Sequence, residues 1–352
     1  MKNIRRSCKR VAAFLAIVVM LTGCAANQTV GTPDDAVKVQ RQVFAMDTVM
    51  FLTAYGPDAE EALDTAAELI YSLEADLDPE NETGSVHALN AGAGASVAVS
   101  QDSINIMSTY MSLWERTDGA LDPGLYPLIR AWGFTTGDYR VPEQGEIDGL
   151  LASKDTGGIT WNEGAETAAV PAGMAVSFGA VAKGYTAQQV LDAMAEVGVE
   201  CAILSLGGNV QTLGDTKPDG SQWQVAVTDP HDTGSYVGML SIGQAAVVTS
   251  GGYQRYFERD GRTYIHIIDP ATGYPVENDL LSVTVVTDDG ATADGLSTAL
   301  FVMGLQGALD YYETESGFEL VLITTDDRVI VTPGLKESFT EGGDGYTYEY
   351  LG

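Results

Sequence analysis

The segment 249–275, TSGGYQRYFERDGRTYIHIIDPATGYP, contains the histidine best placed for chemistry. Two strand-like runs, 253–258 and 264–268, flank Asp260 and Gly261, a pair typical of hairpin turns. His266 would lie on the second strand, just before a tight turn, and an unperturbed imidazole titrates near pH 6.5. It is therefore a candidate general base. Taken alone, the pattern favours a histidine that only supports the hairpin.

Three oxygen-bearing side chains, Asp294, Ser297 and Thr298, lie in the run ADGLSTA. The run predicts a helix over 294–303, on which Asp294 and Thr298 are four residues apart and share a face. A carboxylate with hydroxyl groups suits hard cations such as Mg²⁺ or Ca²⁺. Taken alone, the pattern favours a plainer alternative, in which Asp294 caps the helix and Thr298 bonds a backbone carbonyl.

A lysine at the start of a helix is the third chemical feature. Lys183 follows Gly179 at the head of a helix that apolar spacing extends to about residue 197. Free N–H groups at a helix N-terminus, together with an ammonium group, suit a phosphate. The run is not a Walker loop, and the chain has neither GxGxxG after a strand nor a GxSxG elbow. Three histidines in the whole chain also disfavour a histidine-rich zinc site.

The elements that must position these residues are strands and helices in irregular alternation, without the βαβ period of a parallel sheet. This order predicts an α+β fold with mixed sheets flanked by helices, in one domain over 41–352. The expected helices are 58–77, 103–116, the Lys183 helix up to Gly198, 294–303 and a weaker 307–314. The expected strands are 43–51 with a central turn, 201–206, 222–227, 239–249, 281–287 and a hairpin over 318–332. A polar loop is expected at 78–90, and two prolines and two glycines make 120–134 irregular.

The first 23 residues indicate an export signal rather than part of the fold. Five basic residues precede the apolar run 11–21, which is too short to span a bilayer as a stable helix. The following LTGC resembles a bacterial lipobox, in which cleavage precedes the cysteine and its thiol receives a diacylglyceryl group. Two acyl chains give a stable anchor, so we expect lipidated Cys24, a tether over 24–40 and a place on the extracytoplasmic face of a membrane. The alternative is an ordinary signal peptide with an incidental cysteine.

Charge restricts the possible partners. The chain has 18 basic and 49 acidic residues, a formal net charge of −31. Loss of the first 23 residues, five basic and none acidic, would make the charge −36. This excess argues against nucleic acid and against an anionic membrane face, so membrane contact is expected through the lipid alone. Only Cys201 would remain as a free thiol, so a disulfide framework is excluded.

Several runs together resemble the ApbE family, the FAD:protein FMN transferases. They occur in the family's order over about 43–305, and HIIDPATGYP combined with ADGLSTA is a specific signature. The matching runs are 45–48, 121–123 with 132–134, 179–185, 206–209, 223–230, 249–275 and 293–299.

The resemblance implies FAD bound in a cleft between two halves of an α+β fold, and magnesium-dependent cleavage of the FAD pyrophosphate. FMN would pass as a phosphoester to a threonine, or sometimes serine, hydroxyl of an extracytoplasmic electron-transfer protein, and AMP would leave. His266 would be the base for that hydroxyl. The resemblance places FAD contacts at Met46, Ala120, Leu121, Asp122, Ser177, Lys183 and Ile268. It places the metal, Mg²⁺ with Ca²⁺ or Mn²⁺ as alternatives, on Asp294, Thr298 and the backbone carbonyl of Ala180, with Ser297 as a further ligand.

Three positions depart from the family pattern. Asp47 stands where many members have glycine, and Ser177 stands where many have an aspartate that bears on an adenosine contact. The loop around Asn81 lacks the tyrosine that often covers the bound nucleotide, so lower FAD affinity is expected. Two alternatives to the transferase stay open at this point. One is an FAD pyrophosphatase that uses water as acceptor, and the other is a surface lipoprotein that binds flavin without catalysis.

Overall fold

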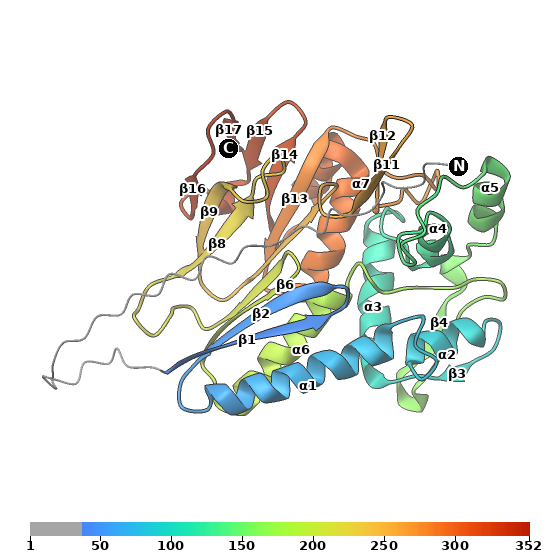
Figure 1. Ribbon diagram of the computed structural model, residues 1–352, viewed down its shortest axis with the longest axis horizontal. Helices are drawn as coiled ribbons and strands as arrows, with labels where there is room; N and C mark the ends of the chain where they lie inside the picture. The colour runs from blue at the N-terminus through green and yellow to red at the C-terminus, as the bar shows by residue number, and fades with distance from the viewer. Residues whose placement is uncertain (1–36) are drawn as a thin grey trace, which may run out of the picture.

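A nine-stranded sheet runs through the centre of the molecule (Figure 1). The computed structural model describes residues 37–352, so the expected signal peptide, Cys24 and the tether up to residue 36 lie outside it. Neighbouring strands of the sheet are antiparallel except for the last pair, which is parallel. In spatial order the strands are β1 (Lys38–Ala45), β2 (Thr48–Tyr55), β6 (Cys201–Leu206), β7 (Asn209–Leu213), β10 (Ala246–Gly251), β13 (Leu280–Thr287), β14 (Glu319–Thr324), β15 (Arg328–Val331) and β17 (Thr347–Tyr350).

Three helices cover one face of this sheet (Figure 1). They are α1 (Ala59–Leu77), α6 (Ala182–Glu196) and α7 (Gly290–Thr314). Apolar residues every three or four positions give α1 one buried stripe, which includes Leu63 and Ile70. That stripe packs against α6 and against Met50 and Leu52 of β2. The shared core fixes the position of α6, whose first turn contains the candidate phosphate-binding lysine.

A small sheet covers part of the opposite face. Its strands are β8 (Trp223–Thr228), β9 (Tyr236–Ile242) and β16 (Phe339–Glu341). Trp223 and Leu240 of this sheet share a core with Val247 and Val321 of the large sheet. The molecule is therefore layered around the large sheet, with helices on one side and a second sheet on the other.

The third part of the fold lies beside the helical layer (Figure 1). Its helices are α2 (Ser85–Ala91), α3 (Gln101–Arg116), α4 (Tyr126–Ala131) and α5 (Gln144–Ala152), with 3₁₀ turns η1 (Pro123–Leu125), η2 (Thr156–Gly158) and η3 (Glu163–Ala165). Its strands are β3 (Val97–Ala98), β4 (Thr160–Asn162) and β5 (Thr167–Ala169), and the remaining elements of the chain are the hairpin β11 (Tyr256–Arg259) and β12 (Arg262–Ile265) and the turn η4 (Pro333–Leu335). Within residues 37–352, no helix combines the length and the apolar character that a membrane crossing requires.

The sequence predicted the architecture and most of the elements. An α+β fold with mixed sheets is confirmed, and so is the position of the strand–turn–strand that begins the large sheet. The confirmed elements also include α1, α3, the end of α6 before Gly198, β6, β8, β13 and the hairpin of β14 and β15.

Four expectations are wrong. The segment 78–90 is not only loop because α2 begins in it, whereas 120–134 is irregular as expected, with only the short η1 and α4. The expected strand 239–249 is two strands, β9 and β10, separated by a turn. Strand β1 begins at Lys38, inside the stretch that we expected to be tether. His266 follows β12 directly rather than lying within a strand.

Helix α7 is broken at Gly304. The backbone there has φ 73° and ψ −179°, a region that is essentially restricted to glycine. The loop before β13 holds both ends of the break: the side chain of Asn278 donates to the carbonyl of Phe301, and Asp279 accepts from the N–H of Leu305 at 2.9 Å. The helix is thus two capped halves, which agrees with the two helical runs expected over 294–303 and 307–314.

Candidate active site

Several turns meet at one edge of the large sheet, here the edge formed by the ends of its strands and not an outermost strand. The turn between β1 and β2 holds Met46 and Asp47 at φ 49° and 59°, and the turn between β6 and β7 is formed by Gly207 and Gly208. The register places both turns at the edge where β10 ends. They pack tightly, because a Cβ on Gly207 would lie 2.7 Å from the hydroxyl of Thr48. This edge brings together the motifs that contain Met46, Gly207 and the segment 249–275.

His266 is half-buried at this edge, with its ring centroid 6.4 Å from that of Phe134. Its Nδ1 lies 3.1 Å from the carbonyl oxygen of Arg255, and its backbone N–H donates to the same oxygen at 3.0 Å. A carbonyl oxygen only accepts, so Nδ1 carries the proton and the lone pair of the neutral imidazole is on Nε2. The side chain can therefore accept a proton at Nε2.

The pKa of His266 differs from the sequence expectation of about 6.5. Burial lowers the pKa to about 4, and the positive charges of Lys183 and Arg255 act in the same direction, against the hydrogen bond to the Arg255 carbonyl. The imidazole is consequently neutral throughout the physiological range. It is available as a base at neutral pH without first losing a proton.

Asp294 is buried in α7, with 4% of its surface exposed. It does not cap its own helix, because α7 begins at Gly290 and the side chain of Asp289 accepts from the N–H of Thr292 at 2.6 Å. The plainer alternative for Asp294 is therefore wrong. Its Oδ2 instead accepts from the backbone N–H of Gly184 at 2.8 Å, in the first turn of α6. One helix thus caps the start of another, where the N–H groups favour a negative charge.

The surroundings of Asp294 suit a cation. Burial raises the pKa of Asp294, whereas Lys183 and the Gly184 N–H favour the charged form. The amide group of Asn209 also favours the charged form, although its Nδ2 is buried without a hydrogen-bond partner. The Asn209 Nδ2 is a donor, so it suits an acceptor such as a phosphate oxygen, whereas the buried carboxylate of Asp294 suits the cation.

Two hydroxyl groups on α7 face the end of β10. Ser250 Oγ lies 2.8 Å from Ser297 Oγ and 3.1 Å from Thr298 Oγ1. Ser297 also donates to the carbonyl of Asp294 at 2.8 Å, so this hydroxyl, rather than that of Thr298, is bonded to the helix backbone. The sequence analysis missed Ser250, although it lies in the 249–275 segment directly before the glycine pair.

Lys183 lies in the first turn of α6, as the sequence predicted. The approach of α6 to α7 depends on Gly184, because a Cβ there would lie 2.0 Å from the carbonyl oxygen of Gly290. The Lys183 charge lowers the pKa of both Asp294 and His266, so the ammonium group acts on both sides of the site. Two of the three features that the sequence singled out thus meet at the first turn of α6, and the charge of Lys183 also acts on the third, His266.

Of the other predicted FAD-contacting residues, some are buried in apolar cores and some hydrogen-bond to neighbouring loops. Ile268 and Leu121 are 3% and 2% exposed and belong to apolar cores, so their side chains pack within the fold. Ser177 donates its N–H to the carbonyl of Pro123 at 3.1 Å, and its hydroxyl accepts from Gly179 at 3.2 Å. These bonds join the 120–123 run to the run that contains Ala180.

The carboxylate of Asp122 is fully occupied within the fold. It accepts from Gly124 at 2.8 Å and from Thr156 at 2.7 Å, and it pairs with Lys154 at 2.8 Å. Asp122 therefore shapes the loop that contains Ala120, instead of offering a free charge to a ligand. The half-buried Met46 packs against both helical cores and is the more open side chain of this set.

The donors predicted for the metal, on Asp294, Thr298 and the Ala180 carbonyl, are of the type that Mg²⁺ prefers. All three donors are oxygen atoms, and within residues 37–352 no cluster of three or more His, Cys, Asp or Glu side chains offers a competing site. Mg²⁺ is usually bound through one or two carboxylates, with waters and substrate phosphates completing its six positions. A single buried carboxylate next to a lysine is consistent with that mode.

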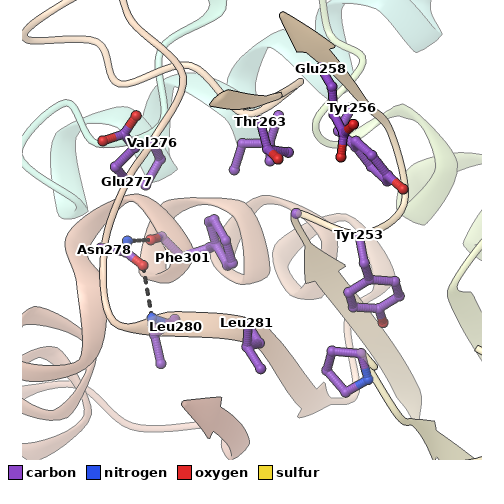
Figure 2. Close-up of a pocket in the computed structure, with 13 residues that line it drawn as sticks. Tyr253, Tyr256, Glu258, Thr263, Val276, Glu277, Asn278, Leu280, Leu281 and Phe301 are labelled. Carbon is purple, nitrogen blue, oxygen red and sulfur yellow. Dashed lines mark hydrogen bonds between the residues drawn. The ribbon is translucent and has the colours of Figure 1, made fainter. Parts of the chain in front are cut away.

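A pocket of about 660 Å³ lies beside the β11–β12 hairpin (Figure 2), and none of its lining residues is a predicted FAD, metal or base residue. One wall is the β11–β12 hairpin with Tyr256 and Thr263, and the other includes Leu280 and Phe301 of the main body. Ile265 in the first wall precedes His266 in the chain, and Gly252 follows Ser250 by two residues. Its volume is in the range of small-molecule sites.

Known proteins resemble this chain in sequence and in fold. The ApbE family model matches residues 46–322. The chain is 31% identical over 295 residues to the FAD:protein FMN transferase of Treponema pallidum, covering 80% of this chain and 82% of that one. It is 30% identical over 306 residues to the FAD:protein FMN transferase of Klebsiella pneumoniae, covering 86% of this chain and 94% of that one.

Solved structures of ApbE proteins have a similar fold. The ApbE protein of Thermotoga maritima superposes with a TM-score of 0.80 at 27% identity, over 86% of this chain and 99% of that one. The flavin transferase ApbE of Vibrio cholerae superposes with a TM-score of 0.73 at 25% identity, over 88% of this chain and 98% of that one.

Proposed function

Since the chain belongs to the ApbE family and transfers FMN from FAD to protein, we propose that it does so with Mg²⁺, onto a threonine or serine hydroxyl, with release of AMP. The observation that supports this mechanism is the hydrogen bond from the Gly184 N–H to Asp294, directly after Lys183 in the first turn of α6, together with the effect of the Lys183 charge on His266. Lys183 can neutralise phosphate charge, Asp294 could do so through a bound cation, and His266 can accept a proton.

In the proposed reaction, Nε2 of His266 takes the proton of the acceptor hydroxyl as its oxygen attacks the phosphorus on the FMN side of the pyrophosphate. A new P–O bond forms, the bond to the bridging oxygen breaks, and that oxygen leaves with AMP. The Lys183 ammonium lies at the start of α6, where it can hold the phosphates. Mg²⁺ held by Asp294, Thr298 and the Ala180 carbonyl would neutralise charge that develops on the phosphate oxygens.

Intact mass measurement tests this function directly. The full chain is incubated with FAD, Mg²⁺ and a purified, unmodified acceptor domain. This domain comes from a protein that carries a flavinylated threonine in its natural form. We expect the acceptor to gain the mass of one FMN phosphoester and AMP to appear in equal amount. Free FMN and AMP with an unmodified acceptor would indicate a pyrophosphatase, and FAD that stays intact would indicate a binding protein.

We expect Lys183→Met to weaken FAD binding far more than riboflavin binding, because riboflavin lacks the phosphates that the ammonium would hold. Isothermal titration with both ligands measures the two losses. Lys336→Met, which removes an exposed lysine far along the chain, serves as the matched control and should change neither affinity. Equal losses for the two ligands in Lys183→Met would instead indicate a packing role.

We further propose that the protein is anchored to the outer face of a cell membrane through lipid on Cys24, which lies outside the described residues. The support is the LTGC run after a short apolar segment. In Cys24→Ser we expect loss of the lipid and of cleavage at this site, measured by mass spectrometry and membrane fractionation. A mature wild-type chain without lipid would contradict the anchor.

A further inference from the structure

We propose that Phe44, Val49 and Phe51 form the surface on which the acceptor protein docks during FMN transfer. We call these three residues the apolar patch. The inference rests on the proposed function, because a transferase must hold a protein surface beside His266, whereas a pyrophosphatase need not.

The apolar patch is unusually exposed for its residue types. Phe44 is 67% exposed, Val49 47% and Phe51 50%. Phe44 of β1 is directly opposite Val49 of β2, and Phe51 is two residues further along β2, so the three side chains are neighbours on one face. The alternate residues of the same strands, Val43, Ala45, Met50 and Leu52, face the helices and are at most 3% exposed.

The patch lies beyond the cover of the small sheet. Among the described residues, the core beneath β8, β9 and β16 extends toward this side only as far as Tyr55 and Ile203. The patch is nearer the turn at 46–47, at the other end of β2 (Figure 1). Contiguous exposed aromatic and aliphatic side chains on a soluble domain mark sites of protein interaction.

The patch is linked to the catalytic histidine by two contacts. Asp47, in the turn between Phe44 and Val49, pairs with Arg255 through Oδ2 and a guanidinium nitrogen 3.4 Å apart. The carbonyl of Arg255 in turn holds Nδ1 of His266 at 3.1 Å. A protein seated on the patch therefore lies next to the loop that orients the base, where its hydroxyl must arrive.

Charge explains why this contact is apolar. With a net charge of −31, most of the surface would repel an acidic acceptor. Arg255 carries a positive charge between the apolar patch and His266, and it already pairs with Asp47. Burial of two phenylalanines gives affinity that depends little on the acceptor's own charge.

The test is the double variant Phe44→Thr/Phe51→Thr in the full chain. Threonine keeps the preference for strand, so β1 and β2 should persist. The probes are the purified acceptor domain and a short peptide that spans only its threonine. We expect the KM for the domain to rise about tenfold or more, with kcat, the KM for FAD and the KM for the peptide unchanged.

Tyr71→Ala is the matched control, because Tyr71 is 50% exposed on α1, on the other side of the sheet. It should leave every constant unchanged. An unchanged KM for the domain in the double variant would overturn the proposal. Two results would assign the patch to another occupant and so overturn the proposal, provided that the KM for the domain stays the same. One is loss of binding to phosphatidylglycerol vesicles in the double variant. The other is a wild-type dimer that dissociates in the double variant. A wild-type chain that cleaves FAD but never modifies the domain would overturn the transferase mechanism itself.

Discussion

His266→Asn should transfer FMN about a hundred to ten thousand times more slowly than the wild-type chain and should bind FAD nearly normally. Asparagine can keep the hydrogen bond to the Arg255 carbonyl through its amide, but it cannot accept a proton at the position of Nε2. Single-turnover transfer to the acceptor domain measures the rate, and titration with FAD measures binding.

The pH profile separates a base from a hydrogen-bonding side chain. Because the pKa of His266 is lowered to about 4, kcat/KM should be flat around neutrality and should fall as pH decreases through about 4. Bound phosphates would favour the imidazolium and raise this pKa, so the fall in kcat should occur at higher pH than the fall in kcat/KM. Both ionisations should be absent from His266→Asn.

His87→Asn is a close control, since the Nδ1 of His87 also lies 3.0 Å from a backbone carbonyl, that of Pro79. It should transfer FMN at the wild-type rate. Near-normal transfer by His266→Asn, or a defect confined to FAD affinity, is incompatible with the role of base.

Asp294→Asn should abolish metal-dependent stabilisation and reduce transfer by at least about a hundredfold, because the only carboxylate of the proposed metal site loses its charge. Without metal, stability should change by less than about 1 kcal/mol, since the asparagine Oδ1 can still accept from the Gly184 N–H. The two effects are measured by thermal unfolding with and without Mg²⁺ and by the transfer rate.

The control for this prediction is Asp289→Asn, at the N-cap of the same helix. It should retain the shift of the thermal midpoint by Mg²⁺, because it leaves all proposed ligands in place. Full magnesium-dependent activity in Asp294→Asn would show that the carboxylate acts only as a cap on α6.

The sequence predicted a helix at Asp294 but not where that helix begins. The expected helix started at Asp294, whereas α7 begins at Gly290. Gly290 lies in the first turn of α7, where a Cβ would lie 2.0 Å from the side chain of Gln211. This glycine serves close packing between distant segments, which no local pattern reveals.

Long-range contacts also explain the other differences. The short helix α2 begins in a polar run, and its start is held by Asp76 of α1, which accepts from the N–H of Ser85 at 3.1 Å. The pKa of His266 depends on its burial near Phe134 and on the charges of Lys183 and Arg255. Residue types and spacing identified the candidate base, but only the assembled fold determines its protonation.

The break at Gly304 separates the half of α7 that contains Asp294 from the C-terminal end of that helix. The first half is tied down at both ends, by the Asp289 side chain at its start and by Asn278 on the Phe301 carbonyl at its close. Fraying that begins at Thr314 therefore stops at the break. A change in the length of the distal half therefore need not alter the register of Asp294 against α6.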